Sequence, residues 1–481
     1  MKGHTKIKLT NTKTGQVDVY ESDNEFTSAL DYIYKGTASG HCYDPYSILS
    51  KTGWTNFTGG LVAFDTTLDT DCIFPPASAT AVAYGAYNYT DDPGNGLRGI
   101  YNTSSSDIGL NSEALDDYGN GSSTRYSATY EYTFTEDEAI GTIASVCLTS
   151  TTNGLVGYGG STITSNTSES TGINLSSNYP QYSGIGDMTM VGTEAGDEVI
   201  YLLDDENDTV NCVRIDSTSA ITFIQRRAWL QSANLFRTMS SSTNTLMNEQ
   251  SVDLETPIAS ASRVWANYDT DNNYIYIISS SSSSSTASTS ATISVHRFTY
   301  DTTAHTVDTS SVQAWSFTNP TGDSLYASSG YHTLFAYDDT LYVSATSYYY
   351  AIELGDSITS TAIEPSKSDL SMNTTNATFI SASNGRIYVQ GGGSSGSVGS
   401  AVISDNDGTY TLGRRENEYL LDSASTLAVP VLSNPCILMT NDSSYRFILH
   451  PCYLATVNNL EEPIEKTSEQ TMTITYTITE E

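Results

Sequence analysis

Five segments of the chain share one pattern: a short strand, a turn rich in Gly, Asn or Asp, and a second apolar strand. They are MTMVGTEAGDEVIYLL from Met188, SRVWANYDTDNNYIYII from Ser262, HTLFAYDDTLYVSA from His332, TFISASNGRIYVQG from Thr378 and LAVPVLSNPCILMT from Leu427. The second strands begin at residues 199, 274, 341, 386 and 436. The last two intervals, of 45 and 50 residues, match the size of a four-stranded propeller blade, and the first two, of 75 and 67 residues, have room for an extra blade or long loops. The pattern predicts a β-propeller of five to seven blades over 187–455, with a second sandwich or a β-solenoid as structural alternatives.

The first 165 residues show a different organisation. KIKLT (6–10) and VDVYE (17–21) alternate in polarity, and their connector ends in Gly15, which predicts a β-hairpin. Apolar residues at helical spacing then predict one short helix over about 23–35. Strand-like segments separated by Gly, Asn and Asp clusters follow, so we expect 1–165 to form a β-sandwich-like domain.

Three further segments complete the predicted organisation. Residues 166–186 contain little that could be buried and are expected to form a linker. The run of serines from Ser279 to Ser285 is expected to be an exposed loop. Residues 456–481 end in TMTITYTITEE, which alternates strictly between Thr and larger side chains. We expect this C-terminal strand to return to the N-terminal domain, or alternatively to close the propeller. The fold class predicted for the whole chain is all-β.

The composition excludes several functional classes. The chain of 481 residues has 55 acidic and 20 basic side chains, a formal net charge of −35. Phosphates would repel such a polyanion, so no nucleic-acid partner is expected. No stretch approaches 18 apolar residues, so no membrane span is expected, and MKGHTKIKLT lacks the apolar core of a secretion signal. We therefore expect synthesis in a host cytoplasm without a signal peptide.

Charge is distributed unevenly. Residues 1–51 contain six Lys and six acidic residues and are neutral, so the remaining 430 residues hold 49 acids and 14 bases, which accounts for the whole −35. A neutral end on an acidic body favours an end that docks and a body that faces solvent.

Several segments together resemble one family. They are KIKLTNTKTGQVDVYESDNEFTSALDYI near the start, GGLVAFDTTLDTDCIFPPA, LRGIYNTSSSD and YTFTEDEAIGTIASVCLTS within 59–150, and the close YLATVNNLEEPIEKTSEQTMTITYTITEE. In this order they resemble virion structural proteins, of the tail-fibre, receptor-binding or head-fibre type, in tailed phages that infect Firmicutes and gut bacteria. The resemblance covers about 1–165 and 451–481. It implies a virion component with an attachment domain and an exchangeable exposed domain, and it brings no catalytic residues.

No catalytic constellation emerges from the sequence. Propellers do host glycosidases, which need two convergent carboxylates, but acids are so frequent here that their presence selects none. The six His lie in no nucleophile motif. No phosphate-binding glycine motif precedes a predicted helix. We expect no enzyme activity and no bound cofactor.

Oxygen-rich turns are the candidates for a metal. Asp269 and Asp271 lie in one such turn, and Asp405 and Asp407 lie in another. Convergent carboxylate and carbonyl oxygens bind Ca²⁺, although neither turn matches a 12-residue EF-hand loop. The alternative is a polar hairpin turn that uses Asn and Gly for its backbone angles.

Aromatic side chains among hydroxyl residues are the candidates for ligand binding. Tyr326, Tyr331, Tyr348, Tyr349 and Trp315 stand among Ser, Thr and Asn, a setting that suits sugars and adaptable protein contacts. The alternative is that tyrosines in the repeats form the core, as we expect for Tyr201, Tyr276 and Tyr342.

These observations favour a non-enzymatic virion protein. Residues 1–165 and 456–481 would contact other virion proteins, and the propeller would display loops to a host-surface glycan or protein. Many weak contacts on one particle would supply avidity, and a homo-oligomer is expected from the virion setting. The alternatives are a capsid or tail decoration protein without a ligand, and a propeller glycosidase or depolymerase acting on host glycans.

Overall fold

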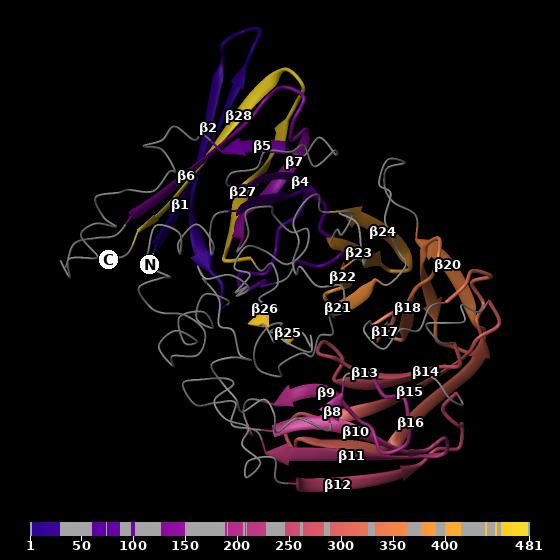
Figure 1. Ribbon diagram of the computed structural model, residues 1–481. Helices are drawn as coiled ribbons and strands as arrows, with labels where there is room; N and C mark the ends of the chain where they lie inside the picture. Colours follow the sequence, from indigo (N-terminus) through magenta and orange to yellow (C-terminus); the bar gives the residue numbers. More distant parts are fainter. Residues whose placement is uncertain are drawn as a thin grey trace, which may run out of the picture. The chain divides into compact units, whose positions relative to one another are not determined.

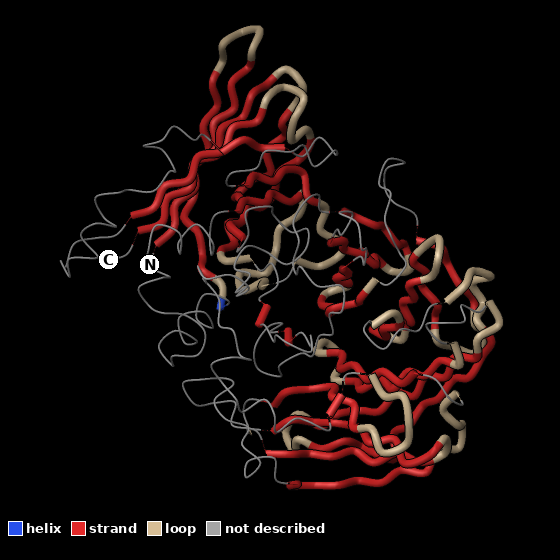
Figure 2. Tube along the Cα trace, in the orientation of Figure 1, coloured by secondary structure: helices blue, strands red, loops and turns tan. Residues whose placement is uncertain are grey.

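The computed structural model describes a set of ranges that are built from strands and turns (Figures 1 and 2). These ranges are 2–28, 60–73, 75–86, 98–101, 127–149, 188–189, 191–204, 207, 209–227, 246–259, 263–282, 289–325, 332–363, 377–390, 400–414, 438–439, 448–449 and 454–479. All the elements within them are β-strands, which confirms the predicted all-β class. The chain forms two compact units, Met1–Thr162 with Pro451–Glu481, and Ile163–His450.

The first unit is a closed barrel in the strand order β1-β2-β27-β7-β3-β4-β5-β6-β28. Its strands are β1 (Lys2–Asn11), β2 (Val17–Phe26), β3 (Gly60–Phe64), β4 (Ala81–Ala86), β5 (Arg98–Tyr101), β6 (Ser127–Phe134), β7 (Gly141–Thr149), β27 (Thr456–Lys466) and β28 (Gln470–Thr479). Neighbouring strands are antiparallel except β4 and β5, which are parallel.

Pairing around this barrel is uneven. Strands β2, β1, β28 and β6 pair along most of their length, and so do β27, β7, β3 and β4. Among the described residues, these two groups meet at two short junctions. On one side β2 pairs with β27 at Glu25 and Phe26, and on the other β5, which follows β4, pairs with β6 through Ile100 and Tyr101. The unit therefore lies between the predicted sandwich and a regular barrel, because two well-paired sheets meet at two short junctions.

The N-terminal hairpin forms as predicted, but the predicted helix does not begin where expected. Lys6 lies opposite Glu21, and the connector bends at Gly15, where φ is +72°. Strand β2 continues through Phe26, so the first four residues of the predicted helix (23–35) are strand. Tertiary pairing with β1 overrides their local preference. Thr27 has no regular structure, Ser28 is helical, and the rest of that prediction, from residue 29 onward, lies outside the described residues.

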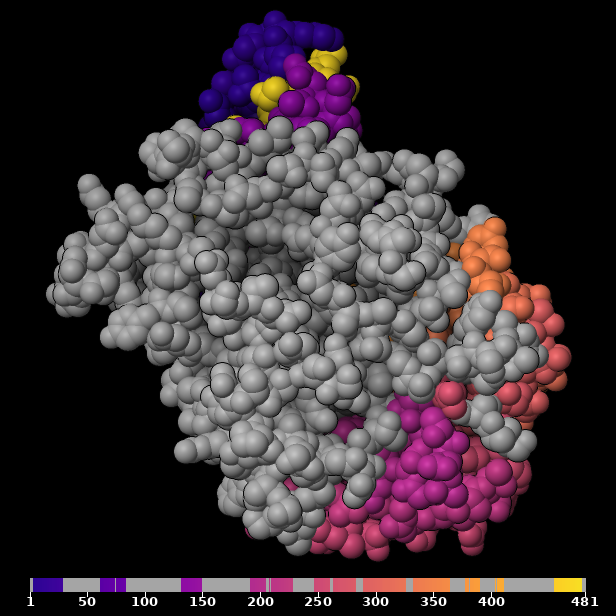
Figure 3. Space-filling model, viewed as in Figure 1, coloured from indigo at the N-terminus to yellow at the C-terminus, as the bar shows by residue number. Residues whose placement is uncertain are grey.

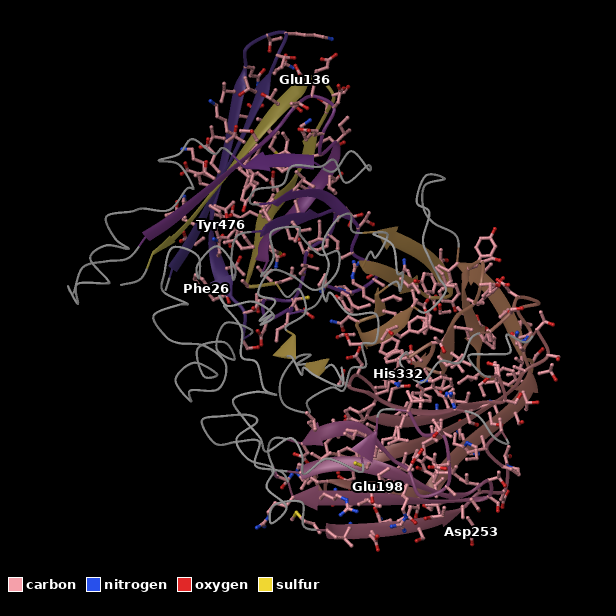
Figure 4. The ribbon with its side chains drawn as sticks, viewed as in Figure 1. Phe26, Glu136, Glu198, Asp253, His332 and Tyr476 are labelled. Atoms are coloured by element: carbon pink, nitrogen blue, oxygen red, sulfur yellow. The ribbon has the colours of Figure 1, made fainter. Side chains whose placement is uncertain are left out.

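The C-terminal strand β28 occupies a central position in the first unit. It lies between β1 and β6, with Ile474 opposite both Ile7 and Tyr132. Its larger side chains point into the core, where the fully buried Tyr476 donates a hydrogen bond to the Thr456 hydroxyl (Figure 4). The alternation of TMTITYTIT thus separates a buried apolar face from a threonine face.

The first unit is interrupted by the second at a single place. The chain leaves after β7 and returns just before β27, and there the Ala455 N–H donates a hydrogen bond of 2.7 Å to the Leu148 carbonyl. The Leu148 N–H in turn donates to the Thr456 hydroxyl at 3.0 Å. Residues 163–450 are therefore inserted between two neighbouring strands.

The second unit is a succession of sheets in chain order, and their strands pair antiparallel except β8 and β9, which are parallel. The first contains β8 (Met188–Thr189), β9 (Glu198–Asp204), β10 (Thr209–Ser217), β11 (Ala220–Arg227) and β12 (Leu246–Asp253). The second contains β13 (Arg263–Asp269), β14 (Tyr274–Ser280), β15 (Thr292–Asp301) and β16 (Thr306–Thr318). The third contains β17 (Leu334–Tyr337), β18 (Thr340–Ser344), β19 (Tyr349–Glu353) and β20 (Thr359–Ile363). The fourth contains β21 (Thr378–Ser383), β22 (Arg386–Gln390), β23 (Ser400–Asn406) and β24 (Thr409–Arg414), and β25 (Leu438–Met439) pairs with β26 (Ile448–Leu449).

These sheets follow one another side by side. Each sheet contacts the next through one strand, with β9 beside β13, β13 beside β17 and β17 beside β21 (Figure 1). One apolar core fills the space between the first two sheets, around Phe223 and Phe298, and another fills the space between the third and fourth, around Phe379. Sheets arranged in this way are what the predicted propeller requires. The number of blades stays a prediction.

Two predictions about segments and charge need correction. Ser279 and Ser280 are buried residues of β14, and the Ser279 hydroxyl accepts a hydrogen bond from the Ala259 N–H at 2.8 Å. Ser282 is buried as well, so of the exposed loop predicted for Ser279–Ser285 only Ser281 is exposed among the described residues, and 283–285 lie outside them. The charge division also fails to follow the units: 163–450 hold 30 acids and 11 bases, a net −19, and the rest holds 25 and 9, a net −16. Only residues 1–51 are neutral.

Candidate functional site

A cavity of about 290 Å³ lies between the first and second sheets of the second unit. Its lining comes from the segment before β9, the β10–β11 turn, the segment before β13 and the start of β13. The lining residues are Gly192, Thr193, Glu194, Ala195, Ile215, Ser217, Thr218, Ile258, Ala259, Arg263 and Val264. This volume is near the lower end of the range for small-molecule sites.

Close backbone contacts fix the shape of the cavity. Gly192 and Val264 exchange two hydrogen bonds, of 2.8 and 2.9 Å, which join the two sheets. A Cβ at Gly192 would lie 2.4 Å from Ile215 Cδ1 and 3.0 Å from Val199 Cγ2, so a larger residue here would displace the end of the Ile215 side chain. The Asp197 carboxylate holds the adjoining turn by accepting hydrogen bonds from the N–H groups of Thr193 and Glu194 at 2.7 and 3.1 Å. The cavity is thus built by the backbone.

The chemistry of the lining suits binding. Its floor is apolar, from Ile215, Ile258, Ala259 and Val264, of which none is more than 7% exposed. Hydroxyl side chains, one acidic residue and one basic residue complete the wall. The lining includes one carboxylate, Glu194, and neither His nor Cys. Such a wall can hold a small ligand with an apolar face and hydroxyl groups, and it provides no nucleophile with an adjoining base.

The predicted ligand-binding aromatics do not form one site among the residues that the structure describes. Tyr349 is buried, with its ring centroid 6.0 Å from that of Phe379, whereas its neighbour Tyr348 is 41% exposed. Trp315 lies partly buried on β16 of the second sheet. Tyr326 and Tyr331 lie outside the described residues. Of the described candidates, Tyr348 alone is an exposed ring.

Trp315 belongs to a stack that sequence reasoning missed. The Arg297 guanidinium lies 4.3 Å from the ring centroid of Tyr274 and 6.0 Å from that of Trp315. Arg297 also forms an ion pair with Asp339 of the third sheet, and Tyr276 donates a hydrogen bond of 3.1 Å to the same carboxylate. The stack therefore ties the second sheet to the third. No spacing in the sequence signals it, because its residues come from three strands and a turn.

The carboxylates predicted as metal ligands at Asp269 and Asp271 accept hydrogen bonds from the protein. Asp269 is 2% exposed, and its oxygens accept the N–H groups of Asp271, Asn272 and Asp338 and the Asn272 side-chain amide, at 3.0–3.1 Å. Burial raises the pKa of this carboxyl, and the hydrogen bonds from Asn272 and Asp338 oppose that shift. Asp271 accepts the Tyr337 hydroxyl and the Asn384 N–H, both at 2.6 Å. Both carboxylates thus hold turns together.

The second predicted pair behaves in a similar way. Asp405 accepts the Tyr342 hydroxyl at 2.7 Å and the Gly408 N–H at 3.0 Å, whereas Asp407 is exposed with φ of +51°. Among the residues that the structure describes, no three His, Cys, Asp or Glu side chains are grouped so that they could hold a metal ion. Ca²⁺ binding by these turns therefore stays a prediction, and the described residues bring no such group of ligands together.

Comparisons with known proteins give little. No family model matches the chain, and no curated protein matches it. A solved structure from Bacteroides fragilis, provisionally described as a 6-phosphogluconolactonase, aligns with 11% identity over 59% of this chain and 85% of that chain, with a TM-score of 0.22. Likeness at this level carries no argument about fold or activity. None of the described elements is a helix long and apolar enough to cross a membrane.

Proposed function

We propose that this chain is a non-enzymatic structural protein of a phage virion. Its first unit docks on the particle, and its second unit, a β-propeller, is displayed for adhesion to the host surface. The family resemblance of residues 1–165 and 451–481 supports this proposal, since both ends belong to the first unit. Position on the particle, tail or head, is left open.

The insertion of the second unit is the observation that carries the proposal. Because Leu148 and Ala455 are hydrogen-bonded neighbours, residues 163–450 leave and rejoin the first unit at one place. A domain inserted in this way can change without disturbing the pairing of β7, β27 and β28. This arrangement suits an attachment unit with an exchangeable display unit.

The cavity supports a binding role over a catalytic one. Glycoside cleavage generally uses two carboxylates on either side of the scissile bond, and among the described residues Glu194 is the one carboxylate of the cavity lining. An apolar floor with hydroxyl groups around it fits one sugar residue of a surface glycan. We propose that the cavity takes such a residue, with avidity supplied by the many copies on a particle.

Replacing residues 163–450 with a short Gly-Ser linker tests whether the first unit docks on the particle and the second unit supplies adhesion. The 2.7 Å contact between Leu148 and Ala455 means that a short linker spans the gap without strain. We expect the variant to enter particles and those particles to lose adsorption to the host. Normal adsorption by these particles would exclude the adhesion role.

A pair of matched variants tests the cavity. Thr218 lines the cavity and is exposed, so Thr218→Trp would cover the opening, whereas the neighbouring exposed Ser219 does not line it. We expect Thr218→Trp to reduce adsorption at least tenfold and Ser219→Trp to leave it unchanged. Equal adsorption by both variants would exclude the cavity. Release of reducing ends from host polysaccharide by the wild-type protein would instead favour a depolymerase.

A further inference from the structure

Strand β2 has one paired edge and one open edge. Residues Val17–Asn24 pair with β1 in unbroken register, while on the other side β27 pairs with β2 only at Glu25 and Phe26. Within the part of the chain that the structure describes, no main-chain hydrogen bond reaches the outer edge of Val17–Asn24. The backbone groups along this edge are available to another strand.

The open edge lacks three features that usually prevent strand pairing, although it does carry acidic side chains. Strand β2 contains no Pro and no Lys, and its pairing with β1 shows no bulge. Three apolar side chains are also exposed there: Val17 at 46%, Val19 at 49% and Tyr20 at 38%. The hairpin is visible in indigo on the surface in Figure 3. A long, flat, partly apolar edge of this kind is typical of one that is covered by a partner.

Charge indicates what the partner carries. Strand β2 has four acids, Asp18, Glu21, Asp23 and Glu25, and no base. On its paired side, β1 meets it with bases: Lys6 lies 2.7 Å from Glu21, and His4 lies 3.0 Å from Asp23. A second copy of β2 would place acids opposite acids, which is unfavourable. A strand with Lys or Arg at alternate positions would repeat the arrangement on the β1 side.

We infer that Val17–Asn24 of β2 receives, by strand addition, an extended segment of another protein with Lys or Arg at alternate positions. Main-chain hydrogen bonds would supply affinity, and the alternating acids would supply specificity. The inference rests on the proposed function, since it identifies the contact through which the first unit docks on the particle.

A synthetic peptide with the sequence of residues 2–11, KGHTKIKLTN, is a suitable probe. This sequence already pairs antiparallel with the other edge of β2 and carries bases at alternate positions. We expect the full chain to bind it and the amides of Val17–Asn24 to gain protection from hydrogen exchange. Because the chain has a net charge of −35 and attracts any cation, a scrambled peptide of equal composition is the control. Equal binding of the scrambled peptide, or unchanged protection in β2, would overturn the inference.

Two double variants give a second test. Val17→Lys with Val19→Lys adds the charges that natural proteins use to block edges, while Val17→Thr with Val19→Thr keeps β-branched residues without charge. We expect at least tenfold weaker peptide binding for the Lys pair and no change for the Thr pair, with equal melting temperatures. If the Lys pair binds the peptide normally and enters particles normally, the edge contact is wrong and the attachment role stands. If the variant without 163–450 fails to enter particles, although its first unit is folded, the attachment role itself is wrong.

Discussion

The hydroxyl of Tyr342, in the third sheet of the second unit, donates a hydrogen bond of 2.7 Å to Oδ2 of Asp405 in the fourth. The ring is fully buried, and burial raises the pKa of its hydroxyl, so this group stays a donor. The same device recurs between Tyr276 and Asp339, and between Tyr337 and Asp271. Tyrosine therefore serves two purposes: its ring fills the core and its hydroxyl joins neighbouring sheets. This use accounts for part of the excess of 34 Tyr over 12 Phe.

Removing the Tyr342 hydroxyl should destabilise the second unit. Tyr342→Phe keeps the ring but deprives Asp405 of a donor, and we expect a loss of about 1–3 kcal/mol. The melting temperature of the full chain measures it. Tyr348→Phe is the control, since that ring is exposed, and should shift stability by no more than about 0.5 kcal/mol. Equal shifts for both variants would contradict the role given to the Tyr342 hydroxyl.

His332 should make the second unit sensitive to acid. The residue is 2% exposed, neither ring nitrogen has a hydrogen-bond partner among the described residues, and burial lowers its pKa from 6.5 to about 4. Between these values the unfolded chain binds more protons than the folded one. The free energy of unfolding therefore falls as the pH is lowered from 6.5 to 4, by about 3 kcal/mol for this group.

A substitution at His332 tests this pH dependence. His332→Leu removes the titrating group and leaves no partner unsatisfied, so stability at pH 7 should be unchanged or higher. The loss of stability on going to pH 4.5 should be smaller than in the wild type. His4→Gln, at an exposed position, is the control and should follow the wild-type curve. Parallel curves for His332→Leu and the wild type would disprove the assignment.

Replacing Gly192 should destabilise the second unit, because the Ile215 side chain would have to move. Gly192→Ala would place Cβ 2.4 Å from Ile215 Cδ1, and such overpacking costs about 1–3 kcal/mol. Adding Ile215→Val removes the clashing methyl group, so the double variant should recover part of the stability lost by Gly192→Ala. A double-mutant cycle on melting temperatures measures this coupling. Additive losses would show that the clash does not occur.

Arg297 should contribute more than an exposed arginine does. Arg297→Met keeps the apolar stem but removes the guanidinium from Tyr274, Trp315 and Asp339, with an expected loss of about 1–2 kcal/mol and altered Trp fluorescence. Arg214→Met is the control, because Arg214 pairs with Asp216 at a more exposed site and should cost about 0.5 kcal/mol. Equal losses of stability for the two variants would contradict the larger contribution expected of Arg297.

Local patterns predicted local structure well. The alternation around Gly15 predicted the hairpin, and the repeated strand–turn–strand units predicted β9, β14, β18 and β22, with Tyr201, Tyr276 and Tyr342 in the core as expected. Pairing between strands that are distant in the sequence was harder to predict. That β2 would continue to Phe26, or that β5 would join β6 through two residues, depends on partners distant in the sequence.

The candidate site was not predictable from the sequence. Its walls include Gly192, Ile215, Ile258 and Val264. No sequence motif marks these residues, and they come together only where two sheets meet. The acidic turns were visible, but whether a carboxylate binds a metal or its own backbone depends on geometry. At Asp269 four donors from the protein already surround the carboxylate.

The pairing of β1 with β28 has a consequence for biosynthesis. Lys2 lies opposite Thr479, so β1 is synthesised long before the strand that completes its sheet. The whole of 163–450 is synthesised in between and can fold first. Until β28 is synthesised, the strand between β1 and β6 is absent. Translation that stops before β28 therefore leaves the first unit incomplete, whatever the state of the second unit.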